Sequence, residues 1–270
     1  MLTGGLTRAR GYPRKAFLSL VPSHSALLYR LAKRYVDLYN GDNNSDMKVN
    51  GEFRFMQRNL PKCETIFDIG ANVGQWTALA LSVNPTASIH CFEPSRNSFQ
   101  RLLANRFPAS VVCNNFGLSS ARGEGKLFVF EECSGTNSLY KREGLEGVGL
   151  RTQEREETVC LDTVDHYCLE RGIRAIDFAK VDVEGHELEV LKGMTGLLAS
   201  GQVGIIQFEY GGCAIDAGVL LKDIFAFFKD FAYSFYKIYP RETRLVREYD
   251  QRLENFQYQN WAIIKNGRAG

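Results

Sequence analysis

Short apolar runs alternate with segments of helical periodicity along most of the chain, beginning near residue 63. The apolar runs are bounded by glycine, proline or polar residues, and they predict β-strands at 65–69, 88–93, 111–116, 126–130, 157–161, 175–183 and 204–210. Apolar positions three or four residues apart predict helices between them, at 75–83, 95–107, 162–172, 186–199 and 216–231. Strands that alternate with helices form a mostly parallel sheet covered on both faces. Three consecutive strands predict an antiparallel end, at 233–239, 244–249 and 257–265.

The first 49 residues depart from this alternation, and we predict that they form a helical extension to a main domain at 50–267. Residues 1–24 mix glycine, proline, arginine and serine, which predicts a poorly ordered lead-in. A helix then follows, with Ser23 or Ser25 as its cap, because leucine and tyrosine recur at helical spacing. Within the main domain, 132–156 is rich in glycine and charge without periodicity, which predicts a flexible insertion.

The composition is that of an ordinary globular protein, since 44% of the residues are hydrophobic and 24% are charged. No apolar run approaches the ~18 residues that a membrane-spanning helix needs. The net charge of +2 gives the chain little overall attraction to phosphate, so we expect no nucleic-acid partner. The seven cysteines include no C-x-x-C pair. Their pattern argues against a disulfide framework or a zinc site and favours a reducing, cytoplasmic setting.

The charge is unevenly distributed. Seven basic residues and no acid precede Asp37, and the remaining 26 basic and 31 acidic residues leave the rest of the chain at −5. Three interpretations of this basic segment stay open. It is a mitochondrial-type transit segment, an amphipathic helix in peripheral contact with a membrane surface, or a helix packed on the main domain with its basic residues in solvent.

The first segment with residues suited to ligand binding or catalysis runs from Phe67 to Gly74 and reads F-D-I-G-A-N-V-G. A strand enters a tight glycine turn and a helix follows, which is the place where open α/β sheets bind ligands. Asn72 occupies the position of the middle glycine in the dinucleotide fingerprint, so that fingerprint is absent. The acid at the strand end, Asp68, repels a pyrophosphate but suits the ammonium and sulfonium charges of S-adenosylmethionine. Gly70 gives the ligand room to approach.

Two further segments follow at the same predicted edge. Glu93 ends the next strand, 19 residues after Gly74, where a carboxylate accepts both hydroxyls of a ribose. Asn115 lies at the end of the third strand and is a candidate for the adenine edge, although an ordinary Asn/Gly turn also explains this segment.

The segment from Lys180 to Glu187 reads K-V-D-V-E-G-H-E and carries the largest cluster of ionisable groups. Alternation along a strand sends Lys180, Asp182 and Glu184 to one side, where they can satisfy one another or bind an acceptor. Glu209 ends the following strand at the same edge. Three carboxylates there are compatible with a divalent metal, but we do not predict one.

These residues resemble the FkbM family of class I S-adenosylmethionine-dependent methyltransferases. The resemblance covers about residues 50–265, and its most specific part is the segment V-D-V-E-G-H-E; it is carried by 67–74, Glu93-Pro94, 181–187, Leu191-Lys192-Gly193 and Asn260-Trp261. It implies a Rossmann-like fold with a seven-stranded sheet, mostly parallel with a reversed last strand. It also implies methyl transfer to an oxygen of a sugar, glycolipid or polyketide-type acceptor.

Carried over by position, the resemblance implies a cofactor pocket made by Asp68, Gly70, Asn72, Gly74 and Glu93. It implies an acceptor site bordered by Lys180, Asp182, Glu184 and Glu209. The general base is Asp182, Glu184 or His186, and the sequence does not rank them. Two other functions stay open: a nucleotide- or sugar-binding module without catalysis, and a nicotinamide-dependent dehydrogenase, which the missing third loop glycine disfavours.

Overall fold

The computed structural model describes residues 24–129, 135, 137–143 and 155–268. They belong to two compact units, Met1–Asn40 and Gly41–Gly270. The described part of the first unit is one amphipathic helix, α2 (Ala26–Asn40). The boundary that we predicted after residue 49 therefore falls inside the second unit. Most of the lead-in predicted at 1–24, and most of the insertion predicted at 132–156, lies outside the described residues.

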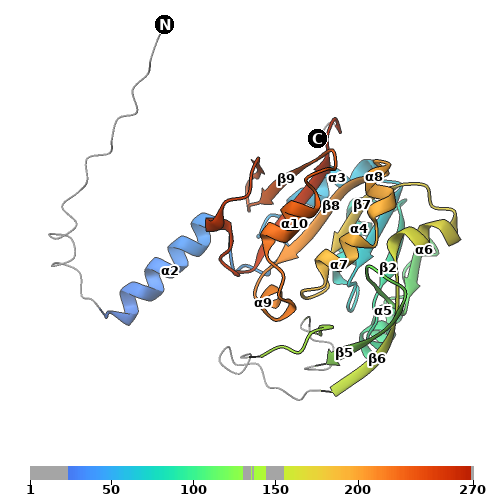
Figure 1. The fold of residues 1–270 in the computed structure, drawn as a ribbon, viewed down its shortest axis with the longest axis horizontal. Helices are drawn as coiled ribbons and strands as arrows, with labels where there is room; N and C mark the ends of the chain where they lie inside the picture. Colours follow the sequence, from blue (N-terminus) through green and yellow to red (C-terminus); the bar gives the residue numbers. More distant parts are fainter. Residues whose placement is uncertain (1–23, 130–134, 136, 144–154, 269–270) are drawn as a thin grey trace, which may run out of the picture. The chain divides into compact units, whose positions relative to one another are not determined.

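The second unit contains a large mixed sheet and a small separate sheet (Figure 1). The strands found in the described ranges are β1 (Thr65–Ile69), β2 (Ser88–Phe92), β3 (Val111–Asn114), β4 (Gly117–Leu118), β5 (Gly123–Val129), β6 (Arg155–Asp162), β7 (Ile176–Val181), β8 (Val203–Tyr210), β9 (Tyr233–Ile238), β10 (Thr243–Val246) and β11 (Gln259–Lys265). The small sheet has the order β4-β6-β5. The strands predicted at 126–130 and 157–161 thus leave the main sheet and pair with each other.

The large sheet has the order β10-β9-β11-β8-β7-β1-β2-β3. The pairs β1–β2, β2–β3, β1–β7 and β7–β8 are parallel, whereas β11 is antiparallel to both β8 and β9. The fold class predicted from the sequence is confirmed, including the reversed last strand. Strand β10 pairs antiparallel with β9 and adds an eighth described strand to the seven that we expected. The order of connection reverses between β1 and β7, which makes a topological switch point there.

Helices cover both faces of the large sheet and bury two apolar clusters, one on each face. One face carries α3 (Glu52–Asn59), α4 (Gln75–Val83) and α5 (Arg96–Ala104). The other carries α6 (Val164–Arg171), α7 (Glu187–Lys192), α8 (Thr195–Ala199), α9 (Cys213–Ala217) and α10 (Leu221–Phe227). Short 3₁₀ turns occur at Leu60–Lys62 and Gln251–Leu253. Alternate residues of β1 enter opposite clusters: Ile66 packs with α3 and α4, and Phe67 packs with α6.

Two helices predicted as continuous are divided, each at a glycine. The helix predicted at 186–199 is divided into α7 and α8 around Gly193, whose Cβ position lies only 2.1 Å from the carbonyl oxygen of Ser119. The helix predicted at 216–231 is divided into α9 and α10 at Gly218, which has a left-handed φ of 66°. In the described parts of the chain, no helix is both long and apolar enough to cross a membrane.

Candidate active site

A cavity enclosing about 970 Å³ of empty space, part of it open to solvent, lies at the carboxyl ends of β1, β2 and β7. This is the switch point of the sheet, where ligands of open α/β folds bind. Of the eleven residues predicted for the site, seven line the cavity: Gly70, Asn72, Glu93, Lys180, Asp182, Glu184 and His186. The other four, Asp68, Gly74, Asn115 and Glu209, do not.

The glycine turn after β1 is shaped by a close approach of two backbones. Gly70 has a left-handed φ of 84°, and a Cβ at this position would lie 1.8 Å from the carbonyl oxygen of Asp182. The Gly70 and Ala71 N–H groups donate to the Phe92 carbonyl, at 3.0 Å each. Gly74 is the N-cap of α4, also left-handed, and packs against Leu102 instead of lining the cavity. Glycine is therefore required at 70 by contact as well as by φ.

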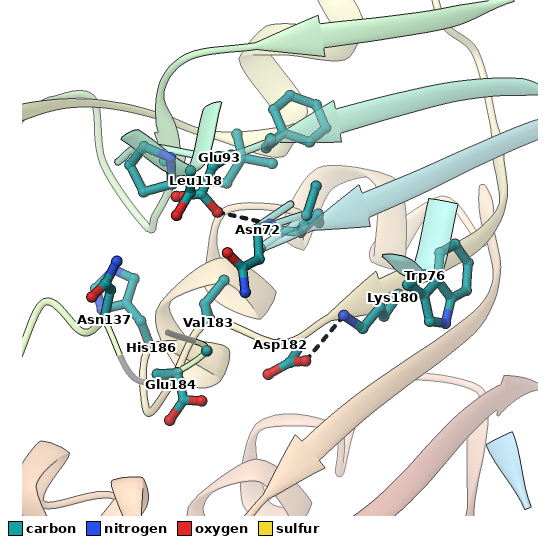
Figure 2. A pocket seen from close by; sticks show the side chains of 18 of the residues that line it. Asn72, Trp76, Glu93, Leu118, Asn137, Lys180, Asp182, Val183, Glu184 and His186 are labelled. Carbon is teal, nitrogen blue, oxygen red and sulfur yellow. Dashed lines mark hydrogen bonds and ion pairs between the residues drawn. The ribbon is translucent and has the colours of Figure 1, made fainter. Parts of the chain in front are cut away.

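Glu93 is held by main-chain donors on both sides. Its Oε2 accepts from the Asn72 N–H at 2.9 Å (Figure 2). Its Oε1 accepts from the Ser95 N–H at 2.9 Å. The side chain is 6% exposed and lines the cavity. Burial outweighs these hydrogen bonds and raises the pKa of Glu93 to about 7. Each oxygen keeps a lone pair for a further donor, such as a hydroxyl of a bound ligand.

Three polar atoms of the cavity wall have no hydrogen-bond partner among the described residues. They are Asn72 Oδ1, Trp76 Nε1 and Asn137 Oδ1, all of them buried. Leaving buried polar atoms unpaired costs about 1–3 kcal/mol each, so a polar ligand that pairs with them gains affinity. Asn115 is not part of this wall, because its amide donates to the carbonyl oxygens of Glu93 and Pro94. Leu118 and Leu127 line this part of the cavity.

Asp68 lies beneath the cavity and is fully buried. Its Oδ2 accepts from the Thr77 hydroxyl at 2.6 Å, and Lys180 Nζ lies 3.8 Å from its Oδ1. The same Lys180 Nζ lies 3.0 Å from Asp182 Oδ2. Burial alone would lower the pKa of Lys180, but Asp182 and Asp68 outweigh burial and raise it, so the ammonium stays charged. Lys180 thus joins the buried carboxylate of β1 to the carboxylate that faces the cavity.

The loop after β7 turns sharply and is stabilised by Glu187. Glu184 has a φ of 53° and Gly185 a φ of 104°, both left-handed. Glu187 Oε1 accepts from the N–H groups of Val183 and Gly185, at 3.1 and 3.2 Å. The turn carries Glu184 away from the straight strand that we assumed. This loop explains why the segment is so distinctive in sequence: its glycine and second glutamate make the turn.

Residues 137–143 lie across the end of this loop. Arg142 pairs with Glu184 at 2.9 Å and lies 3.8 Å from Asp216, while the Ser138 hydroxyl donates to the Glu184 carbonyl at 2.7 Å. Burial and Asp182 raise the pKa of Glu184 to about 8, although Arg142 opposes this shift. The segment lay in the predicted insertion, where no periodicity marked Arg142 as part of a site.

His186 is buried and both of its ring nitrogens have partners. Nδ1 lies 2.9 Å from the Tyr140 hydroxyl, and Nε2 lies 2.9 Å from the Ser119 hydroxyl. Burial lowers the pKa of His186 to about 4, so the ring is neutral at neutral pH. With both nitrogens engaged, this histidine connects three segments of the chain instead of presenting a free base to the cavity.

A buried network that the sequence did not indicate lies beside Lys180. Glu52 of α3 accepts from the Gln207 amide at 2.7 Å and the Asn260 amide at 3.2 Å, and from the Tyr258 hydroxyl at 3.3 Å. Burial raises the pKa of Glu52. Gln207, Tyr258 and Asn260 lie in strands that the sequence predicted. Glu52 was not indicated, because an acid in the first turn of a helix is an ordinary feature.

Carboxylate oxygens of Asp182, Glu184 and Glu209 lie within 4.8 Å of one another. This spacing is compatible with a cation, as the sequence suggested. However, Lys180 and Arg142 already neutralise two of the three groups. We therefore assign no metal to the site.

Comparison with known proteins agrees with this geometry. A family model described as the methyltransferase FkbM domain matches residues 68–235, which is more than half of the chain. The chain belongs to the FkbM methyltransferase family. The matched region includes the glycine turn, Glu93 and the loop after β7, so the family suggested by the sequence is confirmed.

Curated FkbM relatives include hexuronic acid methyltransferase AglP of Haloferax volcanii, 30% identical over 174 residues that make 63% of this chain and 66% of AglP. Methyltransferase sdnD of Sordaria araneosa is 32% identical over 161 residues, 50% of this chain and 62% of sdnD. For 31-O-demethyl-FK506 methyltransferase FkbM of Streptomyces tacrolimicus the identity is 27% over 155 residues, 48% of this chain and 59% of that protein. The chain thus spans less than two thirds of each of these relatives.

Among solved structures, methyltransferase FkbM of Methylobacillus flagellatus is similar with a TM-score of 0.43 and 16% identity. The similarity covers 74% of this chain and 43% of that chain.

Proposed function

We propose that this FkbM-family chain is an S-adenosylmethionine-dependent O-methyltransferase that acts on a hydroxyl of a sugar, glycolipid or polyketide-type acceptor. One observation carries the proposal. Glu93 is fixed by two main-chain N–H groups at the rim of a cavity that also contains unpaired polar atoms of Asn72, Trp76 and Asn137. This arrangement fits the ribose and the polar tail of a nucleoside ligand.

We assign a different role to each of these residues. Glu93 would accept the ribose hydroxyls, and Leu118 and Leu127 would cover an adenine ring. Asn72, whose φ of 46° turns its side chain into the cavity wall, would pair with the amino-acid part. Asp68 would act one layer below, by keeping Lys180 charged and in place. When bound, S-adenosylmethionine supplies an electrophilic methyl group on a sulfonium.

The acceptor would lie against the carboxylates at the ends of β7 and β8. Carboxylates bind hydroxyl donors well, and the chain needs mainly to hold the acceptor oxygen in line with the methyl group. Two relatives support an acceptor of this kind through their names, since one is a hexuronic acid methyltransferase and one a 31-O-demethyl-FK506 methyltransferase. The carboxylates around the site disfavour an anionic acceptor, so a neutral hydroxyl compound fits this chain better than a uronate.

Calorimetry with the full chain tests the proposal. We expect S-adenosylmethionine and S-adenosylhomocysteine to bind, and Glu93→Ala to weaken both by at least 30-fold because two ribose hydrogen bonds are lost. Glu124→Ala, at an exposed position of β5, is the matched control and should leave both affinities unchanged. Binding of NADH in preference to S-adenosylmethionine would instead indicate a dehydrogenase. Binding of S-adenosylmethionine without methylation of any member of a glycoside and glycolipid panel would favour a non-catalytic module.

A further inference from the structure

Glu209, at the end of β8, does not itself line the cavity but adjoins Asp182 and Glu184, which do. It differs from these two carboxylates because its side chain has no counter-ion among the described residues. Asp182 pairs with Lys180 at 3.0 Å and Glu184 pairs with Arg142 at 2.9 Å. For Glu209, no hydrogen bond or ion pair of the side chain is found within the described part of the molecule. Its carboxylate nevertheless lies within 4.8 Å of a carboxylate oxygen of both Asp182 and Glu184.

The register of the sheet explains this position. Gln207 lies opposite Lys180 of β7, and Lys180 lies opposite Asp68 of β1, so the three form one polar row across the sheet. Glu209 is two residues further along β8 on the same face, opposite Asn260 of β11. It therefore stands one step nearer the carboxyl edge than the buried row, next to the carboxylate of Asp182, which lines the cavity.

We propose that Glu209 is the catalytic base that receives the proton of the acceptor hydroxyl. This inference rests on the proposed function and names a residue that the sequence placed only at the border of the acceptor site. In the step, the acceptor oxygen forms a bond to the methyl carbon while the bond from that carbon to sulfur breaks. The sulfur keeps the electron pair and becomes a neutral thioether, and the hydroxyl proton passes to Glu209 and then to solvent.

The competing bases are each engaged elsewhere. Asp182 Oδ2 already pairs with Lys180 and Glu184 Oε2 already pairs with Arg142. His186 has a hydroxyl on each ring nitrogen. Glu209 alone among these groups has both oxygens uncommitted within the described residues.

The surroundings also raise the proton affinity of Glu209. Burial raises its pKa well above the usual range, and neighbouring acids add to the effect. The ionisable groups that face it come from the loop after β7, α3, α7, α9 and the segment before β11: Asp182, Glu184, Glu52, Glu187, Cys213 and Tyr258.

The test begins with the cofactor complexes, which require no acceptor. In protein carrying ¹³C-labelled glutamate carboxyls, the resonance missing from Glu209→Gln identifies Glu209. We expect its titration midpoint to be lower by about one pH unit with S-adenosylmethionine than with S-adenosylhomocysteine, because only the former carries the sulfonium charge. Equal midpoints in the two complexes would place Glu209 away from the reacting atoms and overturn the proposal.

Kinetics supply the second readout, with any neutral methyl glycoside that the wild-type chain methylates. Glu209→Gln should lower kcat about 100-fold with little change in acceptor KM, and Glu209→Asp should restore part of the rate. Glu248→Gln, at an exposed position, is the matched control. Full activity of Glu209→Gln would also overturn the proposal.

Calorimetry with S-adenosylmethionine distinguishes the two levels of failure. Tight binding by wild type and Glu209→Gln alike leaves the proposed function intact whatever the base, whereas no binding by wild type removes the proposed function itself. If the Glu209 resonance shifts on addition of Mg²⁺ or Mn²⁺ alone and activity depends on that ion, Glu209 binds a cation and is not the base, which would overturn the proposal.

Discussion

The two ends of the cavity are built by different means. The end at β1 and β2 is made by main chain: a glycine turn, N–H groups that hold Glu93, and uncharged polar atoms left open for a ligand. The end at β7 and β8 is made by charged side chains, in which Lys180 and Arg142 balance part of a larger set of carboxylates. A main-chain site is fixed once the turn is formed, whereas a site of paired charges depends on every partner.

The largest expected effect is a loss of stability when an ion pair at the charged end of the cavity is removed. Lys180→Met would leave the fully buried Asp68 without a cation, and removing one partner of a buried pair costs about 3–5 kcal/mol of unfolding free energy. Urea unfolding measures this loss. Lys180→Met combined with Asp68→Asn should recover most of it, since the buried charge is then absent. A double variant as unstable as the single one would contradict the pairing.

The next largest effect is a loss of ligand affinity when the glycine turn at the main-chain end of the cavity is altered. Gly70→Ala places a Cβ 1.8 Å from the Asp182 carbonyl and imposes a left-handed φ on alanine. We expect S-adenosylmethionine affinity to fall about 100-fold by calorimetry. Gly211→Ala is the matched control, because its nearest contact is an ordinary 3.4 Å. Equal effects of the two substitutions would mean that the turn at Gly70 does not shape the cavity.

The smallest expected effect is a change of ligand affinity with pH, which depends on Glu93 at the main-chain end of the cavity. The pKa of Glu93 is raised to about 7 by burial, and hydroxyl donors prefer its ionised form. Below pH 7 the bound cofactor must displace a proton, so affinity should fall about tenfold from pH 8 to pH 6. The sign is opposite for folding: the raised pKa favours the folded state most below pH 4.5 and loses this contribution as pH rises through 7. Calorimetry of Glu93→Gln, which cannot titrate at this position, should show a smaller loss of affinity over the same pH range.

The sequence predicted the sheet well because strands buried on both faces are marked by apolar runs and bounded by turns. It predicted the glycine turn and Glu93 because both depend on local features of the chain. The turn needs a glycine with a left-handed φ, and Glu93 directly follows the end of a strand. It did not predict the breaks at Gly193 and Gly218, since both glycines fit within a helical pattern. The break at Gly193 depends on contact with Ser119, which is distant in the chain.

The charged end was predicted less completely, because its partners come from segments without periodicity. Arg142 lies in the glycine-rich region and Glu52 in a short helix that the sequence did not indicate. Asp68 was expected to face the ligand, whereas in the structure it is buried and does not line the cavity. Its burial depends on how α4 and β7 pack around β1, which alternation along a single strand does not specify.

The contact between Gly70 and the Asp182 carbonyl has a consequence for turnover. With no side chain between them, the turn that shapes the proposed cofactor end and the loop that carries the proposed acceptor carboxylates are in direct backbone contact. A displacement of either backbone must displace the other. Departure of the methylated product and departure of the spent cofactor are therefore expected to be coupled events, so that inhibition by S-adenosylhomocysteine should depend on whether an acceptor is still bound.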